Sequence, residues 1–237
     1  RQPIPYRMPP GVRRERINTN NTLVEQNEQA LSYIVDNLEN NDSRAVYKAM
    51  RFDLRQYKYI KMFVHAEAYK NKPLSDNQAV AFLRVGTDFN DNYYQVEVPL
   101  QVTPAGASTE QLIWPQNNQL VIPMDVLTKL KAISIRNQTM SDAVYYDANF
   151  NVVPESAPHV AGQNRYVIKG NPSLGSVRAV MIGVKNVSGS NGLSGEYWFN
   201  ELRVAELENH GGWAAVGSLD ANASELMNIS ATGRMHT

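Results

Sequence analysis

The stretch from Gly195 to Leu207 constrains the fold most, because it has the pattern of one long β-strand, GEYWFNELRVAEL. Side chains alternate between the two faces of a strand, so Trp198 and Val204 share one face while Tyr197 and Phe199 share the other. Large apolar side chains therefore occur on both faces. We expect this strand to be at least half-buried within a β domain.

Similar segments recur along most of the chain, separated by turn-forming Asn, Asp and Gly residues. The expected strands are 45–54, 59–69, 79–88, 93–102, 166–169, 177–185 and 195–207, with a shorter one at 133–136. We expect the first two to pair with each other, and the next two to form a hairpin through the turn at 89–92. Parallel sheets need a crossover helix between strands, and this chain has no such rhythm. The pattern predicts an all-β fold, an antiparallel β-sandwich of jelly-roll type.

One N-terminal amphipathic helix is expected before the first strand. Asn21 or Thr22 can cap a helix that runs to Leu38, with Glu25 placed for a capping box. Its apolar stripe consists of Leu31, Ile34, Val35 and Leu38. We expect this stripe to pack on the chain's own sheet, and binding to a partner protein is the alternative. A second, short helix is expected at 123–131, where a proline suits the first turn.

The composition divides the chain into three segments. Residues 1–21 predict an extended arm, residues 22–210 hold the β-sandwich with its leading helix, and residues 211–237 differ in character. In the last segment, Trp213 precedes about ten alternating residues, which is typical of an outer-membrane β-barrel strand, although a further sandwich strand fits equally well. Because the chain begins with Arg and ends within an alternating segment, we expect it to be an internal piece of a longer protein.

The charge balance argues against a nucleic-acid partner. The chain has 23 Lys and Arg residues against 23 Asp and Glu residues, whereas nucleic-acid binding needs a concentrated basic surface. The absence of cysteine excludes disulfides, zinc–thiolate sites and cysteine nucleophiles. The four histidines lie far apart without metal-binding spacing, so they predict no metal centre.

Glu196 and Glu201 are the obvious carboxylates to consider for a glycoside hydrolase, the enzymatic alternative. Their odd spacing places them on opposite faces of a regular strand, which prevents the close approach that such chemistry needs. Glu201 shares a face with Arg203, and we expect these two side chains to form an ion pair. The sequence therefore predicts no catalytic residue.

Asp88, Asn90 and Asp91, followed by Asn92, place several oxygen atoms in one turn. This grouping suits a calcium ion, and these residues are weak candidates for a metal site. A hairpin turn stabilised by hydrogen bonds from Asn and Asp side chains is the better interpretation, because these residues tolerate turn conformations.

A carbohydrate-binding β-sandwich module at the cell surface is the alternative function. Its candidate binding residues are Tyr93, Tyr94 and Trp114, whose rings could line a sugar-binding surface. Aromatic residues of a sandwich are nevertheless more often core residues, because they bury large apolar areas.

Several segments in collinear order carry a more specific signal. They are DSRAVYK at 42–48, MFVHAE at 62–67, FLRVGTDF at 82–89, NYYQVEVPL at 92–100, GNPSLG at 170–175, MIGVKN at 181–186, WFNELR at 198–203 and GGWAA at 211–215. Together they resemble the SprA/Sov family. Its members are very large outer-membrane proteins of Bacteroidota that are required for gliding motility and form the translocon of type IX secretion.

The resemblance implies a non-enzymatic structural or interaction domain within a giant barrel, with residues 213–234 as the barrel strand that follows it. The expected partners are other protein components of the translocon and exported proteins, with no cofactor. The expected location is the cell outer membrane, on its periplasmic or extracellular face.

Overall fold

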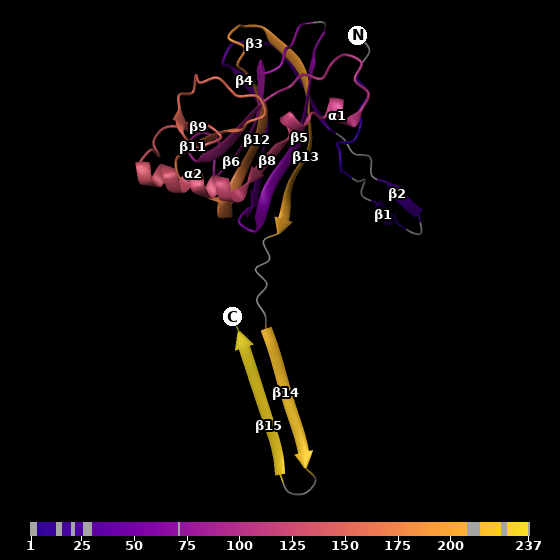
Figure 1. The fold of residues 1–237 in the computed structure, drawn as a ribbon, viewed down its shortest axis with the longest axis vertical. Coiled ribbons are helices and arrows are strands. Elements are labelled where there is room, and N and C mark those ends of the chain that lie inside the picture. The colour runs from indigo at the N-terminus through magenta and orange to yellow at the C-terminus, as the bar shows by residue number, and fades with distance from the viewer. Residues whose placement is uncertain are drawn as a thin grey trace. The chain divides into compact units, whose positions relative to one another are not determined.

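The computed structural model describes residues 4–12, 16–19, 22–25, 30–70, 72–207, 214–223 and 227–236. The chain divides into two compact units, residues 1–206 and residues 207–237. The first unit contains two main β-sheets, drawn with their strands in Figure 1.

The larger sheet has seven strands in the order β10-β9-β11-β7-β6-β12-β4, and they pair antiparallel. These strands are β4 (Ser43–Phe52), β6 (Ala79–Gly86), β7 (Tyr93–Pro99), β9 (Val144–Tyr146), β10 (Val152–Val153), β11 (Arg165–Lys169) and β12 (Val177–Asn186). The smaller sheet has four strands in the order β3-β13-β5-β8. Its strands are β3 (Leu31–Leu38), β5 (Tyr57–Ala68), β8 (Leu120–Pro123) and β13 (Leu193–Leu207). The predicted antiparallel β-sandwich is therefore confirmed.

The remaining elements of the first unit are short, apart from one helix. They are β1 (Arg16–Thr19), β2 (Thr22–Glu25), α1 (Glu110–Ile113), α2 (Met124–Asn137) and two 3-10 turns, η1 (Gln116–Asn118) and η2 (Leu174–Ser176). Strands β1 and β2 pair with each other in a separate two-stranded sheet.

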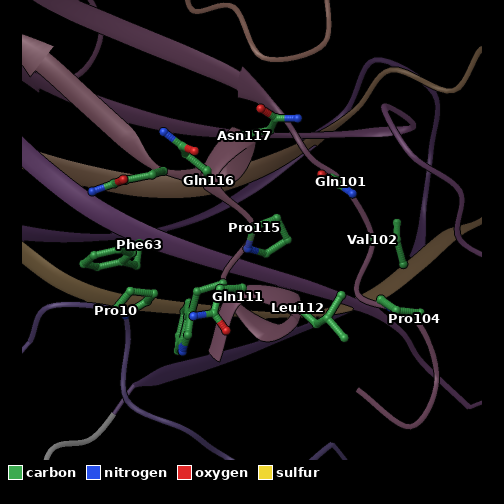
Figure 2. Close-up of a pocket in the computed structure, with 12 residues that line it drawn as sticks. Pro10, Phe63, Gln101, Val102, Pro104, Gln111, Leu112, Pro115, Gln116 and Asn117 are labelled. Atoms are coloured by element: carbon green, nitrogen blue, oxygen red, sulfur yellow. The ribbon is translucent and has the colours of Figure 1, made fainter. Parts of the chain in front are cut away.

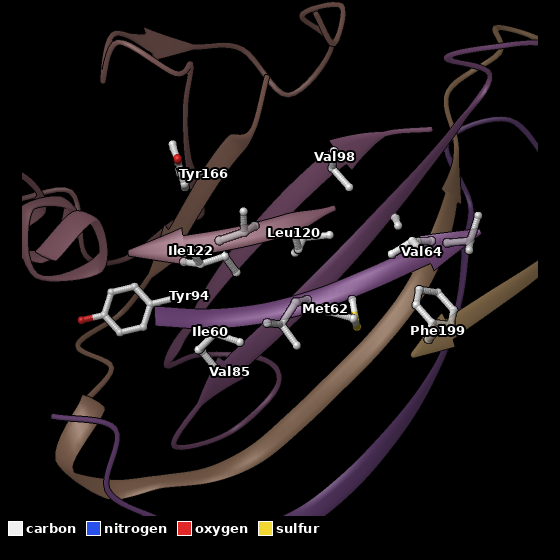
Figure 3. Close-up of a cluster of buried hydrophobic side chains, with 14 of the residues drawn as sticks. Ile60, Met62, Val64, Val85, Tyr94, Val98, Leu120, Ile122, Tyr166 and Phe199 are labelled. Atoms are coloured by element: carbon white, nitrogen blue, oxygen red, sulfur yellow. The ribbon is translucent and has the colours of Figure 1, made fainter. Parts of the chain in front are cut away.

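The main hydrophobic core lies between the two sheets (Figure 3). Strand β5 contributes Ile60, Met62 and Val64, and the larger sheet contributes Val85 and Val98. Ile60, Met62 and Val64 are spaced by two along β5, as the predicted alternation requires. The hairpin of β6 and β7 is also confirmed, with the predicted turn between its two strands.

A second cluster buries the other face of the smaller sheet. Phe63 of β5 and Trp198 of β13 belong to it, together with Trp114 and the N-terminal Ile4. The indole Nε1 of Trp114 donates a hydrogen bond of 2.7 Å to the carbonyl oxygen of Arg7. Residues from the predicted arm thus pack on the outer face of the smaller sheet. Strands β5 and β13 are therefore covered on both faces, by the arm on one side and by the larger sheet on the other.

The predicted N-terminal helix is wrong. Its described residues form β2 and β3, while Gln26 to Gln29 lie outside the described residues. Val35 and Leu38 are three residues apart and yet both are buried, because the register between β3 and β13 shifts here and Asn37 has a φ of 59°. This bulge interrupts the strand alternation and imitates the apolar spacing of a helix.

Two further predictions are wrong. Strands β4 and β5 do not pair, because β4 lies beside β12 in the larger sheet and β5 belongs to the smaller sheet. The segment 133–136 is not a strand, because α2 continues to Asn137. Leu127, Leu130 and Ser134 are buried along this helix at spacings of three and four residues, so one face packs on the sandwich.

The second unit is an antiparallel pair formed by β14 (Ala214–Ala223) and β15 (Met227–His236). The predicted junction at Gly211, Gly212 and Trp213 lies outside the described residues. Within the described residues, no helix has the length and apolar character needed to cross a membrane.

Candidate interaction surface

The sandwich is open along β4, the last strand of the larger sheet. Val46 pairs with Ile182 and Lys48 pairs with Val180, and Val180 belongs to the core. Paired residues point to the same face of a sheet, so Val46 and Lys48 point to the side of the smaller sheet. Val46 is nevertheless 36% exposed. In the described part of the chain, the smaller sheet has four strands against seven and does not cover this margin.

An apolar groove of about 550 Å³ lies on the same open side. Its walls come from β4, β6 and β12 of the larger sheet and from β5 and β13 of the smaller one. Its lining includes Phe52, Leu54, Ile60, Leu83, Val85 and Val204. Met50 and Leu202 also line the groove and are 41% and 44% exposed. The groove therefore presents apolar surface to solvent between the two sheets.

The backbone of Glu201 explains how β13 contributes to this groove. Tyr197 and Phe199 belong to the core, so regular alternation would direct Val204 to the opposite face. Glu201 has a φ of 54°, a left-handed conformation that breaks the alternation, and Val204 packs against the core. The predicted placement of Val204 on the face of Trp198 is therefore wrong.

Strand β4 is basic. It contains Arg44, Lys48 and Arg51 and has no acidic residue. Arg44 forms an ion pair with Asp42 in the turn before the strand. Among the described residues, no ion pair involves Lys48 or Arg51. Two cations on this exposed margin therefore lack a partner within the described part of the chain.

The three aromatic residues of the carbohydrate hypothesis do not form a common surface. Tyr94 lies in the main core, Trp114 lies in the second cluster, and the guanidinium of Arg84 lies 3.9 Å from the centre of the Tyr93 ring. Tyr93, Tyr94 and Trp114 are only 6%, 2% and 3% exposed. Their rings offer no open face on which a sugar could stack, which corrects this alternative reading of the sequence.

A hollow of about 610 Å³ lies beside Trp114 (Figure 2). Its polar lining consists of neutral amides, among them Gln101, Gln111, Gln116 and Asn117, and none of its described lining residues is charged. These amides come from separate segments before, within and after α1. No sequence motif could have identified this hollow, because only the fold brings the segments together.

The predicted turn at Asp88 is an Asx turn. Asp88 Oδ1 accepts hydrogen bonds from the backbone N–H groups of Asn90, Asp91 and Asn92 at 2.9, 2.6 and 3.0 Å. Burial raises the pKa of Asp88, but these hydrogen bonds outweigh it and lower the pKa to about 2. Asp91 forms an ion pair of 3.2 Å with Lys169. Asp88 and Asp91, the two carboxylates considered as calcium ligands, thus have hydrogen-bond and ion-pair partners within the protein. The described residues contain no group of three or more His, Cys, Asp or Glu residues that could hold a metal ion.

The two glutamates of β13 have separate partners. Glu196 Oε1 accepts hydrogen bonds from Trp198 Nε1 at 2.8 Å and from Ser32 Oγ at 3.0 Å. Glu201 Oε2 lies 3.4 Å from Arg203 Nη1. The expected ion pair of Glu201 and Arg203 is therefore confirmed.

A buried charge network surrounds Glu97, and no motif in the sequence indicated it. Glu97 Oε2 lies 2.7 Å from His159 Nε2 and 2.7 Å from Arg165 Nη2. Arg165 Nη1 also donates hydrogen bonds to the carbonyl oxygens of Glu155 and Ala157. The network therefore anchors the loop before β11 to the centre of the larger sheet. A glutamate placed between Val96 and Val98 in a strand was the available signal, since buried charges are normally paired.

A family model described as "Motility related/secretion protein" (SprA_N) matches residues 1–237. The match covers both units of the chain. Comparison with curated proteins gave no match.

Proposed function

Because this chain belongs to the SprA_N family of motility related/secretion proteins, we propose that it is a non-enzymatic structural and interaction domain of the type IX secretion translocon. The observation that carries the proposal is the family match over residues 1–237. The collinear segments that resemble the SprA/Sov family support the narrower assignment to type IX secretion and gliding motility in Bacteroidota.

The open margin of the sandwich supports a role in protein interaction. An edge strand presents unpaired backbone groups, and a neighbouring apolar groove can bury side chains of a bound polypeptide. Strand β4 and the groove beside it combine both features. We propose other components of the translocon and exported proteins as the partners, and the cell outer membrane as the location.

Secretion and gliding assays test the proposed function. In the full-length protein, residues 30–206 are replaced by a short Gly/Ser linker, and the protein is followed by cell fractionation. We expect the altered protein to remain in the outer-membrane fraction while secreted proteins disappear from the medium and gliding stops. Recovery of the unaltered full-length protein in the cytosol would contradict the proposal.

The non-enzymatic part needs a separate test. Glu196→Gln and Glu201→Gln in the full-length protein should leave secretion and gliding unchanged, because both carboxylates have structural partners. A glycan-hydrolysing activity that is lost in either variant would contradict this part of the proposal.

A further inference from the structure

We propose that β4 accepts an additional β-strand from a partner protein, and that this segment carries a carboxylate and an apolar residue two positions apart, opposite Lys48 and Val46. The inference rests on the proposed role as an interaction domain and identifies the surface and the chemistry of the partner.

The backbone of β4 is suited to strand addition. Among the residues that the structure describes, the order of the larger sheet ends at β4, and β12 is the only strand that pairs with it there. Residues 43–49 pair with residues 179–185 of β12 in unbroken register, and the irregularity in the pairing comes after Ala49. An unbroken edge segment offers N–H and C=O groups in the regular spacing that an incoming strand requires.

Several apolar side chains of β4 are exposed, although the ring of Tyr47 contacts that of Phe89. Tyr47 is 69% exposed, and Val46 and Met50 are also exposed. The opposite edge of the same sheet is β10, which has only two residues. A very short edge strand resists further pairing, whereas β4 is long and exposes apolar residues. Its inward-pointing Lys48 disfavours pairing with a strand that has no carboxylate opposite it.

The charges of β4 select the partner. Arg44 and Lys48 flank Val46 on the inward-pointing side of the strand, with Ala45 and Tyr47 pointing outward. A second copy of β4 would bring further cations next to these, and like charges across neighbouring strands are unfavourable. Arg44 already has Asp42 as its partner, so a strand with a carboxylate opposite Lys48 and an apolar residue opposite Val46 would be attracted. The exposed Lys48 therefore argues for an acidic partner and against self-pairing.

The groove gives the incoming segment a place for its apolar side chains. Met50 of β4 and Leu202 of β13 both line the groove and both are exposed. An added strand would lie beside β4 and widen the larger sheet at this edge. Its inward side chains would then lie next to the apolar surface that Met50 and Leu202 form. Backbone pairing and apolar burial would then act on the same segment.

Photo-crosslinking in cells tests the inference with the full-length protein. A photoreactive phenylalanine analogue replaces Tyr47, and the same analogue at Val152 of β10, which is 63% exposed, is the matched control. The crosslinked peptides are then sequenced. We expect position 47, but not position 152, to crosslink to one segment of another protein in which an Asp or Glu lies two residues from an apolar residue.

Substitution of Lys48 tests the charge argument. In the protein with the analogue at position 47, we expect Lys48→Glu to reduce the crosslinked product about five- to tenfold and Lys48→Arg to preserve it, as follows from reversing a cross-strand charge pair. An unchanged yield in Lys48→Glu would overturn the inference. So would the absence of a crosslink, or a crosslink to a second copy, to another segment of the same chain or to lipid.

The outcomes separate this inference from the proposed function. If secretion depends on residues 30–206 but position 47 gives no crosslink, strand addition to β4 is wrong and the proposed function stands. If the full-length protein is found outside the outer membrane while the crosslink forms and depends on Lys48, the proposed function is wrong and strand addition stands.

Discussion

Replacing Glu97 by glutamine should destabilise the sandwich strongly, because Glu97 is the only carboxylate within contact distance of His159 and Arg165 among the described residues. Burial raises the pKa of Glu97, but the hydrogen bond with His159 and the charge of Arg165 outweigh it and lower the pKa to about 2. Relative to its ordinary value of 4.5, this shift corresponds to about 3 kcal/mol at neutral pH. Breaking a buried ion pair usually costs a similar amount, about 3–5 kcal/mol.

Thermal denaturation of the 237-residue chain measures this effect. For a chain of this size, each kcal/mol corresponds to about 2–4 °C in Tm, so Glu97→Gln should lower the Tm by about 6–12 °C. Asp53→Asn is the matched control, because the pKa of Asp53 is also lowered to about 2, by the exposed Arg55. Exposed ion pairs contribute little to stability, and we expect only a small change in Tm for this control.

The pH dependence gives an independent check. The folded pKa of Glu97 lies below its unfolded pKa, so its stabilisation is complete above about pH 4.5 and is lost as the pH falls towards 2. The difference in Tm between the unaltered chain and Glu97→Gln should therefore shrink over this range. A Glu97→Gln loss no larger than that of Asp53→Asn, or a difference that stays constant down to pH 2, would refute the reasoning.

Three further substitutions test other parts of the fold. Gly183→Ala should lower stability by about 1–3 kcal/mol in thermal denaturation, because the new Cβ atom would lie 2.4 Å from the carbonyl oxygen of Arg44; an unchanged Tm would contradict the close strand approach. Asp88→Ala should lower the free energy of unfolding by about 1 kcal/mol at pH 7. The loss should shrink as the pH falls from about 4 to about 2, because the lowered pKa of Asp88 reflects hydrogen bonds to its charged form; urea denaturation at pH 7 and at about pH 2 measures both values. Trp198→Phe should cost about 1 kcal/mol, since it leaves Glu196 Oε1 without its 2.8 Å indole donor, and equal urea midpoints for the two chains would contradict that role.

Strand identity could be predicted where neighbouring residues decide it. In β5, Met62, Val64 and Ala66 are spaced by two and are all buried. The Asx turn at Asp88 joins β6 to β7 as expected, because its hydrogen bonds lie within five consecutive residues. Alternation and turn chemistry are local properties, so they can be read from short segments.

The bulge in β3 could not be predicted in this way. Val35 and Leu38 have the spacing of a helical stripe, and the local pattern favoured a helix. Pairing with β13, which lies more than 150 residues later in the chain, supplies the partner strand that a local pattern cannot show. The same applies at Glu201, where a left-handed residue moves Val204 to the core side of β13.

The candidate surface depends even more on distant contacts. Whether β4 pairs with β5 or with β12 cannot be read from β4 itself, because its alternation is compatible with either neighbour. Strand β4 is exposed because the larger sheet has seven described strands and the smaller sheet only four. The groove forms where residues of both sheets meet.

By itself, the sequence determined that this chain forms antiparallel strands, where its main hairpin turns, and which family it resembles, because periodicity, turn residues and collinear segments are encoded locally. Only the tertiary structure decided which strands are neighbours, which aromatic rings are buried, how Glu97 is paired, and that β4 is left as an open edge. Those properties arise from contacts between residues far apart in the chain, where the sequence records the side chains but not their partners.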